Sequence, residues 1–236
     1  MHNTTFISSM VLSVACVSAA NATVVYNTID PFTESASTNT VNAVTGVNST
    51  LSPSVSSLLT GTLWDVRSIR ARTTHTARAS ASVSIGSSSA VFGVTQVGAL
   101  NTQTLTQQNG YLDYFTANSQ YPDFTNFTSL DFNYTSNFTG TLECRVSLTD
   151  AVNYPVVKTM SVGSGSMSFT LADFGGIALN QEAMGPLTIE FRRSGSNASG
   201  SLTITNLVAN GASIPAPGAL ALLGAAGLVG ARRRRA

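Results

Sequence analysis

Strict alternation of apolar and polar residues is the feature that most constrains how this chain can fold. Between Thr141 and Thr149 every second residue is apolar, and the residues between them are polar or charged. Successive side chains of a β-strand point to opposite faces, so this pattern predicts a half-buried strand. The pattern recurs at residues 130–134, 167–171 and 187–191, and no helical periodicity appears in the body of the chain. The fold class predicted is therefore all-β.

Several further segments have strand composition and are separated by turn residues. Strands are expected at residues 41–47, 79–85, 90–97, 155–162 and 202–208. Turns are expected at Gly86-Ser87-Ser88, Asn109-Gly110, Gly163-Ser164-Gly165, Gly175-Gly176 and Ser194-Gly195-Ser196-Asn197. Ten or more short strands within residues 23–213 predict one antiparallel β-sandwich domain of jelly-roll-like type.

Residues 1–22 predict a secretory signal peptide. An apolar run from Phe6 to Ala20 ends in Ala20-Asn21-Ala22, and small residues at −3 and −1 are typical of a cleavage site. Two alternatives stay open, namely a buried first strand and a lipoprotein signal that uses Cys16. The prediction places the protein outside the cytoplasm, in the cell envelope, at the cell surface or extracellular.

The C-terminal segment, residues 214–236, combines three distinctive features. Pro215-Ala216-Pro217-Gly218 opens an apolar run that continues to Ala231, and Arg232, Arg233, Arg234 and Arg235 follow. The 14 residues from Gly218 to Ala231 would form a helix about 21 Å long, short of the roughly 30 Å hydrocarbon core. The arginines would stay on the cytoplasmic side and retain the chain at the inner membrane.

This tail resembles the PEP-CTERM sorting signal of bacterial exosortase substrates. The resemblance covers the last 23 residues, and Ala216 stands where the family usually has Glu. It implies export, transient anchoring in the membrane through the apolar helix, and processing by an exosortase-like transpeptidase or protease. A plain membrane anchor that is never processed is the alternative. Asp30-Pro31-Phe32, residues 61–67 and residues 169–174 also resemble parts of a domain that often precedes such tails.

Composition argues against catalysis and against nucleic-acid binding. Charged residues make up 10% of the chain, and without the terminal arginines 8 basic residues face 11 acidic ones, a net charge of about −3. His75 is the sole histidine after the signal peptide, so neither a His-dependent triad nor a multi-His metal site is expected, and no cofactor is predicted. Cys144, on the apolar side of its strand, is expected to fill the core. The leading interpretation is a non-enzymatic surface or matrix protein, structural or adhesive in an envelope or biofilm.

An aromatic-rich segment, residues 111–138, supports an alternative function. Aromatic rings stack on the C–H faces of sugars while amides and carboxylates bind the hydroxyls, so this segment is a candidate for contact with exopolysaccharide. Tyr121, Phe124 and Phe127 are the candidate contact residues. The alternative is that these aromatic side chains fill the sandwich core.

A second concentration consists of four arginines within 12 positions, Arg67, Arg70, Arg72 and Arg78. Such a group could hold an anionic polysaccharide through charge-assisted hydrogen bonds. The alternative is a solvated strand face on which the arginines pair with acidic residues.

Overall fold

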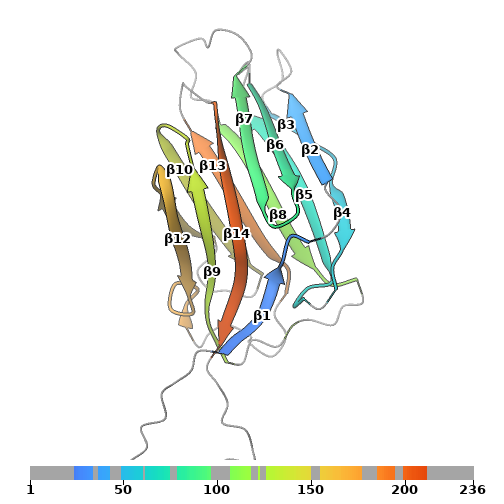
Figure 1. The fold of residues 1–236 in the computed structure, drawn as a ribbon, viewed down its shortest axis with the longest axis vertical. Coiled ribbons are helices and arrows are strands. Elements are labelled where there is room, and N and C mark those ends of the chain that lie inside the picture. The colour runs from blue at the N-terminus through green and yellow to red at the C-terminus, as the bar shows by residue number, and fades with distance from the viewer. Residues whose placement is uncertain are drawn as a thin grey trace, which may run out of the picture.

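Two seven-stranded antiparallel sheets pack face to face in the computed structural model (Figure 1). The structure describes residues 24–33, 37–42, 49–60, 62–74, 79–96, 107–117, 122, 126–149, 155–176, 185–194 and 199–211. The predicted antiparallel β-sandwich is confirmed. The predicted signal peptide (1–22) and sorting segment (214–236) lie outside the described residues, and in the described part no helix is long and apolar enough to cross a membrane.

Each sheet draws strands from the whole length of the domain. Sheet A runs in the order β12-β9-β14-β7-β6-β2, with β1 also paired to β14, and sheet B runs β11-β10-β13-β8-β5-β3, with β4 also paired to β5. The strands of sheet A are β1 (Val24–Asp30), β2 (Ser37–Asn42), β6 (Ala79–Ile85), β7 (Ala90–Gln96), β9 (Phe127–Ser136), β12 (Gly163–Thr170) and β14 (Gly200–Gly211). Those of sheet B are β3 (Ser49–Leu51), β4 (Val55–Leu58), β5 (Val66–Thr74), β8 (Gln107–Phe115), β10 (Thr141–Leu148), β11 (Val156–Met160) and β13 (Leu187–Ser194).

The predicted turn at Asn109-Gly110 is wrong, because both residues lie within β8. Gly110 faces the opposite sheet, where a Cβ atom would lie 2.6 Å from Cδ2 of Phe92 and 2.8 Å from Cγ2 of Val83. The glycine therefore allows the two sheets to approach closely and does not bend the chain.

The predicted turn at Gly163-Ser164-Gly165 is also wrong, since these residues begin β12. A Cβ atom on Gly165 would lie 2.7 Å from the hydroxyl oxygen of Tyr134 on the neighbouring strand. The turn at Gly86 is confirmed, since the Gly86 N–H donates to the Ser89 carbonyl at 2.8 Å between β6 and β7.

Aromatic side chains from both sheets meet in the core. The Phe132 ring of β9 packs edge-on against Phe191 of β13, with centroids 6.2 Å apart, and lies 6.4 Å from the ring of Phe169. Cys144 is fully buried, and burial raises the pKa of its thiol well above the ordinary value. The prediction that Cys144 fills the core is confirmed.

One ion pair is completely enclosed between the sheets. Nη1 of Arg67 donates to Oδ1 and Oδ2 of Asp30 at 2.8 and 2.7 Å, and both side chains are at most 1% exposed. The Tyr114 hydroxyl donates to Oδ2 at 2.9 Å, and the Phe32 N–H donates to Oδ1 at 2.8 Å. Asp30 lies at the end of β1 in sheet A, whereas Arg67 and Tyr114 belong to sheet B, so this cluster joins the two sheets.

The ends of the domain lie side by side. Val24, the first residue of β1, is paired with Gly211, the last residue of β14 (Figure 1). β14 is the longest described strand of sheet A and is also paired with β9 over Leu202–Gly211 and with β7 over Gly200–Ile204. Chain segments that precede β1 and follow β14 therefore connect to the same end of the sandwich.

Candidate functional site

Charged side chains gather on the outer face of sheet B. Strand alternation places Leu112 and Tyr114 of β8 in the core and turns Tyr111 and Asp113 outward. The same rule turns residues of β5, β10 and β13 toward the same side. We call this surface the sheet B face, and it consists of Arg70, Arg72, Asn109, Tyr111, Asp113, Glu143, Arg145, Thr188, Glu190 and Arg192.

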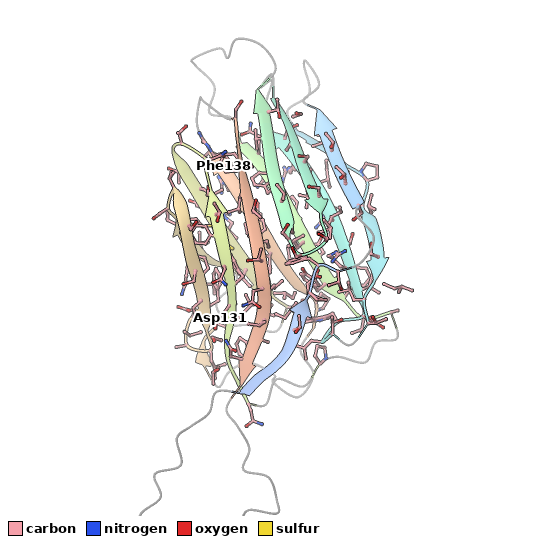
Figure 2. The ribbon with its side chains drawn as sticks, in the orientation of Figure 1. Asp131 and Phe138 are labelled. Atoms are coloured by element: carbon pink, nitrogen blue, oxygen red, sulfur yellow. The ribbon has the colours of Figure 1, made fainter. Side chains whose placement is uncertain are left out.

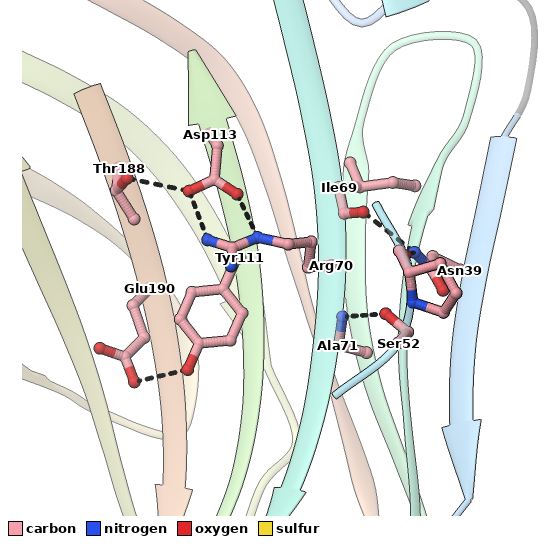
Figure 3. A network of polar contacts seen from close by, with 10 residues as sticks. Asn39, Ser52, Ile69, Arg70, Ala71, Tyr111, Asp113, Thr188 and Glu190 are labelled. Carbon is pink, nitrogen blue, oxygen red and sulfur yellow. Dashed lines mark hydrogen bonds and ion pairs between the residues drawn. The ribbon is translucent and has the colours of Figure 1, made fainter. Parts of the chain in front are cut away.

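Arg70 and Asp113 form a two-pronged ion pair across β5 and β8 (Figure 3). Nε of Arg70 donates to Oδ2 of Asp113 at 2.7 Å, and Nη2 donates to Oδ1 at 2.9 Å. The Thr188 hydroxyl of β13 donates to the same Oδ1 at 2.9 Å. Side chains from β5, β8 and β13 thus meet at the Asp113 carboxylate, and the conformations of Arg70 and Asp113 are fixed by these contacts.

Tyr111 of β8 lies between Arg70 of β5 and Glu190 of β13 on the sheet B face (Figure 3). The Arg70 guanidinium lies 4.9 Å from the centroid of the Tyr111 ring, within the range of a cation–π contact. The Tyr111 hydroxyl donates to Oε1 of Glu190 at 3.4 Å, and the amide of Asn109 donates to the same oxygen. The ring is therefore held between a cation on β5 and a carboxylate on β13.

The protonation states follow from these contacts. The hydrogen bonds to Asp113 raise the pKa of Arg70 further above its already high value, so its guanidinium stays charged. Burial and then the nearby Glu190 carboxylate raise the pKa of the Tyr111 phenol, although Arg72 opposes this shift. At neutral pH the face therefore presents a neutral phenol among charged groups.

Two further features complete the sheet B face. On β10, Arg145 donates from Nη2 to Oε2 of Glu143 at 3.0 Å, and both side chains are about a quarter exposed. In the register of β5, β8 and β13, Arg72 and Arg192 are the neighbours of Asn109 on either side. The face therefore carries four arginines and three carboxylates.

The outer face of sheet A has a different chemistry. Along β9 the outward side chains include Ser129, Asp131, Asn133 and Thr135, and Asp131 is labelled in Figure 2. The other outward positions described in β2, β6, β12 and β14 are dominated by hydroxyl groups: Thr38, Thr40, Ser80, Ser82, Ser84, Ser164, Ser166, Ser168, Thr170, Ser201, Thr203 and Thr205. Charge is thus concentrated on one side of the sandwich.

The aromatic residues predicted to contact glycans are not brought together as a described surface. Phe127 is 3% exposed and packs 6.3 Å from the Phe174 ring, so no ring face is open to a sugar and this part of the prediction is corrected. Tyr121 and Phe124 lie outside the described residues. The alternative, that aromatic side chains of this segment fill the core, is confirmed for five of them: Tyr114, Phe127, Phe132, Tyr134 and Phe138.

The predicted arginine group divides between two environments. Arg67 points into the core and pairs with Asp30, so its assignment to a solvated or ligand-binding patch is wrong. Arg70 and Arg72 belong to the sheet B face, and Arg78 lies outside the described residues. So do the predicted sorting residues Pro215, Ala216, Pro217 and Gly218, and the predicted retention residues Arg232, Arg233, Arg234 and Arg235.

Asn109, Glu190 and Arg192 were not predicted as site residues, and Tyr111 was predicted only as part of the aromatic-rich segment 111–138. Glu190 lies 79 residues from Tyr111 in sequence, and only the pairing of β8 with β13 makes them neighbours. The only sequence signal for Asn109, Glu190 and Arg192 was the alternation of polar and apolar residues along the segments that form β8 and β13.

Neither a protein-family model nor a curated protein matches the chain. Among solved structures, the family 11 carbohydrate-binding module from Clostridium thermocellum, in complex with a β-1,3-1,4-mixed-linked tetrasaccharide, is similar, with 11% identity and a TM-score of 0.38 over 79% of this chain and 95% of that chain. A family 28 module specific for non-crystalline cellulose has 15% identity and a TM-score of 0.33 over 52% and 75% of the two chains.

A different kind of protein is similar to the same extent. The enzymatically active domain of tailspike protein 4 from bacteriophage CBA120 has 9% identity and a TM-score of 0.34, over 79% of this chain and 21% of that chain. With TM-scores this low, the matches assign neither a family nor a function to the chain.

Proposed function

We propose that the protein is a non-catalytic carbohydrate-binding protein whose binding surface is the sheet B face. The observation that carries the proposal is the position of Tyr111, whose ring lies 4.9 Å from the Arg70 guanidinium and whose hydroxyl shares the Glu190 carboxylate with the Asn109 amide. A sugar ring offers an apolar C–H surface and a rim of hydroxyls that both donate and accept. An aromatic group beside fixed donors and acceptors complements both properties.

The fixed geometry of these side chains also supports binding. Asp113 is held by Arg70 and Thr188, and Glu190 is held by Asn109 and Tyr111. Side chains that are already ordered lose little conformational freedom when a ligand binds, so more of the contact energy appears as affinity.

The same contacts favour binding over hydrolysis. A glycosidase needs one carboxyl group that is protonated and can donate to the glycosidic oxygen. Asp113 and Glu190 both accept hydrogen bonds from charged or neutral donors on the neighbouring strands. These carboxylates therefore serve as acceptors that order the face.

Replacing Tyr111 with alanine tests the proposal. With the full-length chain and a panel of soluble polysaccharides, we expect the variant to bind the preferred glycan about tenfold more weakly or worse, because the central contact is lost. Affinity gel electrophoresis and titration calorimetry provide the measurement. Glu190→Gln is expected to weaken binding to a smaller extent, since the amide keeps an acceptor oxygen but loses the charge.

Asp131→Asn is the matched control, because it removes one carboxylate from the opposite face of the sandwich (Figure 2). It is expected to change affinity less than twofold. Equal weakening by Asp131→Asn and Tyr111→Ala, or wild-type affinity in the Tyr111 variant, would contradict the assignment to the sheet B face.

We also propose that the protein is exported and is sorted through its C-terminal segment. The support is the sequence of the two ends, a signal-peptide pattern in residues 1–22 and the Pro-Ala-Pro motif, apolar run and arginine cluster of residues 214–236. An exosortase-like transpeptidase or protease is the expected partner, and surface or matrix localisation follows.

Mass spectrometry of the mature protein tests the sorting proposal. We expect a chain that begins near Thr23 and ends between Pro215 and Gly218. Recovery of peptides that contain Arg232–Arg235 from the mature surface protein would contradict processing and would leave a permanent membrane anchor as the explanation.

A further inference from the structure

Hydrogen-bond donors outnumber charged acceptors on the sheet B face. Each of the four guanidinium groups carries five N–H donors and no acceptor. The three carboxylates are already engaged by neighbours, Asp113 by Arg70, Glu190 by Asn109 and Glu143 by Arg145. Because each guanidinium has five N–H donors, the four arginines bring more donors than the three carboxylates can accept, and this surplus of positively charged donors complements a ligand rich in negatively charged acceptors.

Two of the arginines flank Asn109, two residues from Tyr111 on β8. Arg72 and Arg192 lie on either side of Asn109 in one row across β5, β8 and β13. Neighbouring strands are about 4.8 Å apart, so the backbones at these two positions are separated by roughly 10 Å. Arg72 also acts on the Tyr111 hydroxyl, since it lowers the pKa of that phenol. Both guanidinium groups therefore originate within reach of a ligand that contacts Tyr111.

The distribution of charge distinguishes this face from the rest of the domain. Four arginines against three carboxylates leave a net charge of +1 here, whereas the chain without its terminal arginine run has about −3. The outer face of sheet A is dominated by hydroxyls and has Asp131 among its outward residues. A polyanion is thus attracted to the sheet B face and repelled by the acidic remainder.

We propose that the sheet B face selects an acidic polysaccharide, with a sugar carboxylate bound between Arg72 and Arg192 and the adjoining sugar ring against Tyr111. This inference rests on the proposed carbohydrate-binding function and adds the chemical class of the ligand. Guanidinium groups recognise carboxylates through paired, charge-assisted hydrogen bonds, and this geometry distinguishes a carboxylate from a bare charge.

The experiment compares ligands that differ in one group. The full-length chain is titrated with polygalacturonate, with the same polymer after complete methyl esterification, with dextran sulfate and with double-stranded DNA. We expect polygalacturonate to bind at least tenfold more tightly than its neutral ester and than the two other polyanions. The preference is expected to diminish as the ionic strength rises.

Variants then measure how much Arg72 and Arg192 contribute to the affinity, apart from the other residues of the sheet B face. Arg72→Gln/Arg192→Gln is expected to lose at least tenfold more affinity for polygalacturonate than for the neutral ester. Lys158→Gln is the matched control, since it removes one cation from β11, where Nζ contacts Asp173 at 2.8 Å, and it is expected to bind as wild type. Circular dichroism verifies that each variant is folded.

The possible failures have different meanings. Equal binding of the acid and its ester overturns the acidic specificity and leaves carbohydrate binding intact. Equal binding of DNA, dextran sulfate and polygalacturonate shows attraction to any polyanion and overturns carboxylate recognition. Absence of binding to every glycan in the panel overturns the inference together with the proposed function.

Discussion

Replacement of Asp30 by alanine is expected to lower the free energy of unfolding by about 3–5 kcal/mol. The Asp30 carboxylate accepts from Arg67, Tyr114 and Phe32 inside the sandwich. Its removal leaves the Arg67 cation, which is 1% exposed, in an apolar interior without this counterion. Urea titration followed by the fluorescence of Trp64, the single tryptophan, measures the change.

Two comparisons isolate the cause of this loss. Glu143→Gln removes a carboxylate from an ion pair that is about a quarter exposed, and we expect at most about 1 kcal/mol. The double variant Asp30→Leu/Arg67→Met removes both charges and is expected to recover most of the lost stability. If the double variant were as unstable as Asp30→Ala, the uncompensated charge could not be the reason for the loss.

Replacement of Trp64 by alanine is expected to have a comparable effect. The indole is fully buried, lies 6.3 Å from the ring of Tyr114, and donates from Nε1 to the Gly185 carbonyl at 3.3 Å. Truncation of a buried tryptophan costs about 3–5 kcal/mol, which corresponds to about 6–20 °C in melting temperature for a domain of this size. Thermal melting followed by circular dichroism provides the measurement.

Trp64→Phe serves as the control because it retains much of the ring volume and loses the indole N–H. It is expected to melt between the wild type and the alanine variant. A melting temperature of Trp64→Ala within about 3 °C of wild type would show that this side chain does not support the core. Because Tyr114 contacts both Trp64 and Asp30, the effects of Trp64→Ala and Asp30→Ala should not be additive.

Local alternation was sufficient to predict the fold class and many strands. β6 was predicted with the bounds Ala79–Ile85 that the structure shows, and β10 was predicted to within one residue. β5 and β8 were not predicted. Asn109-Gly110 is a strong turn signal by composition, and only the close approach of Phe92 explains a glycine at this position in a strand.

The site could be predicted only in part, because it depends on the pairing of distant strands. Arg67, Arg70 and Arg72 look equivalent in the sequence, but alternation along β5 turns Arg67 inward and the other two outward. Tyr111 and Glu190 meet through the register of β8 and β13, which no local pattern specifies. Phe127 was misassigned because aromatic composition does not distinguish a core residue from a stacking platform.

The pairing of Val24 with Gly211 has a mechanical consequence for a domain held by its C-terminal segment. Tension that enters at Gly211 acts along β14, which is hydrogen-bonded to β9 on one side and to β1 and β7 on the other. Such a pull loads many hydrogen bonds in parallel as shear and does not open them one after another. A sandwich tethered at this end and bound to a polymer through sheet B would therefore resist extension at its most extensively paired strand.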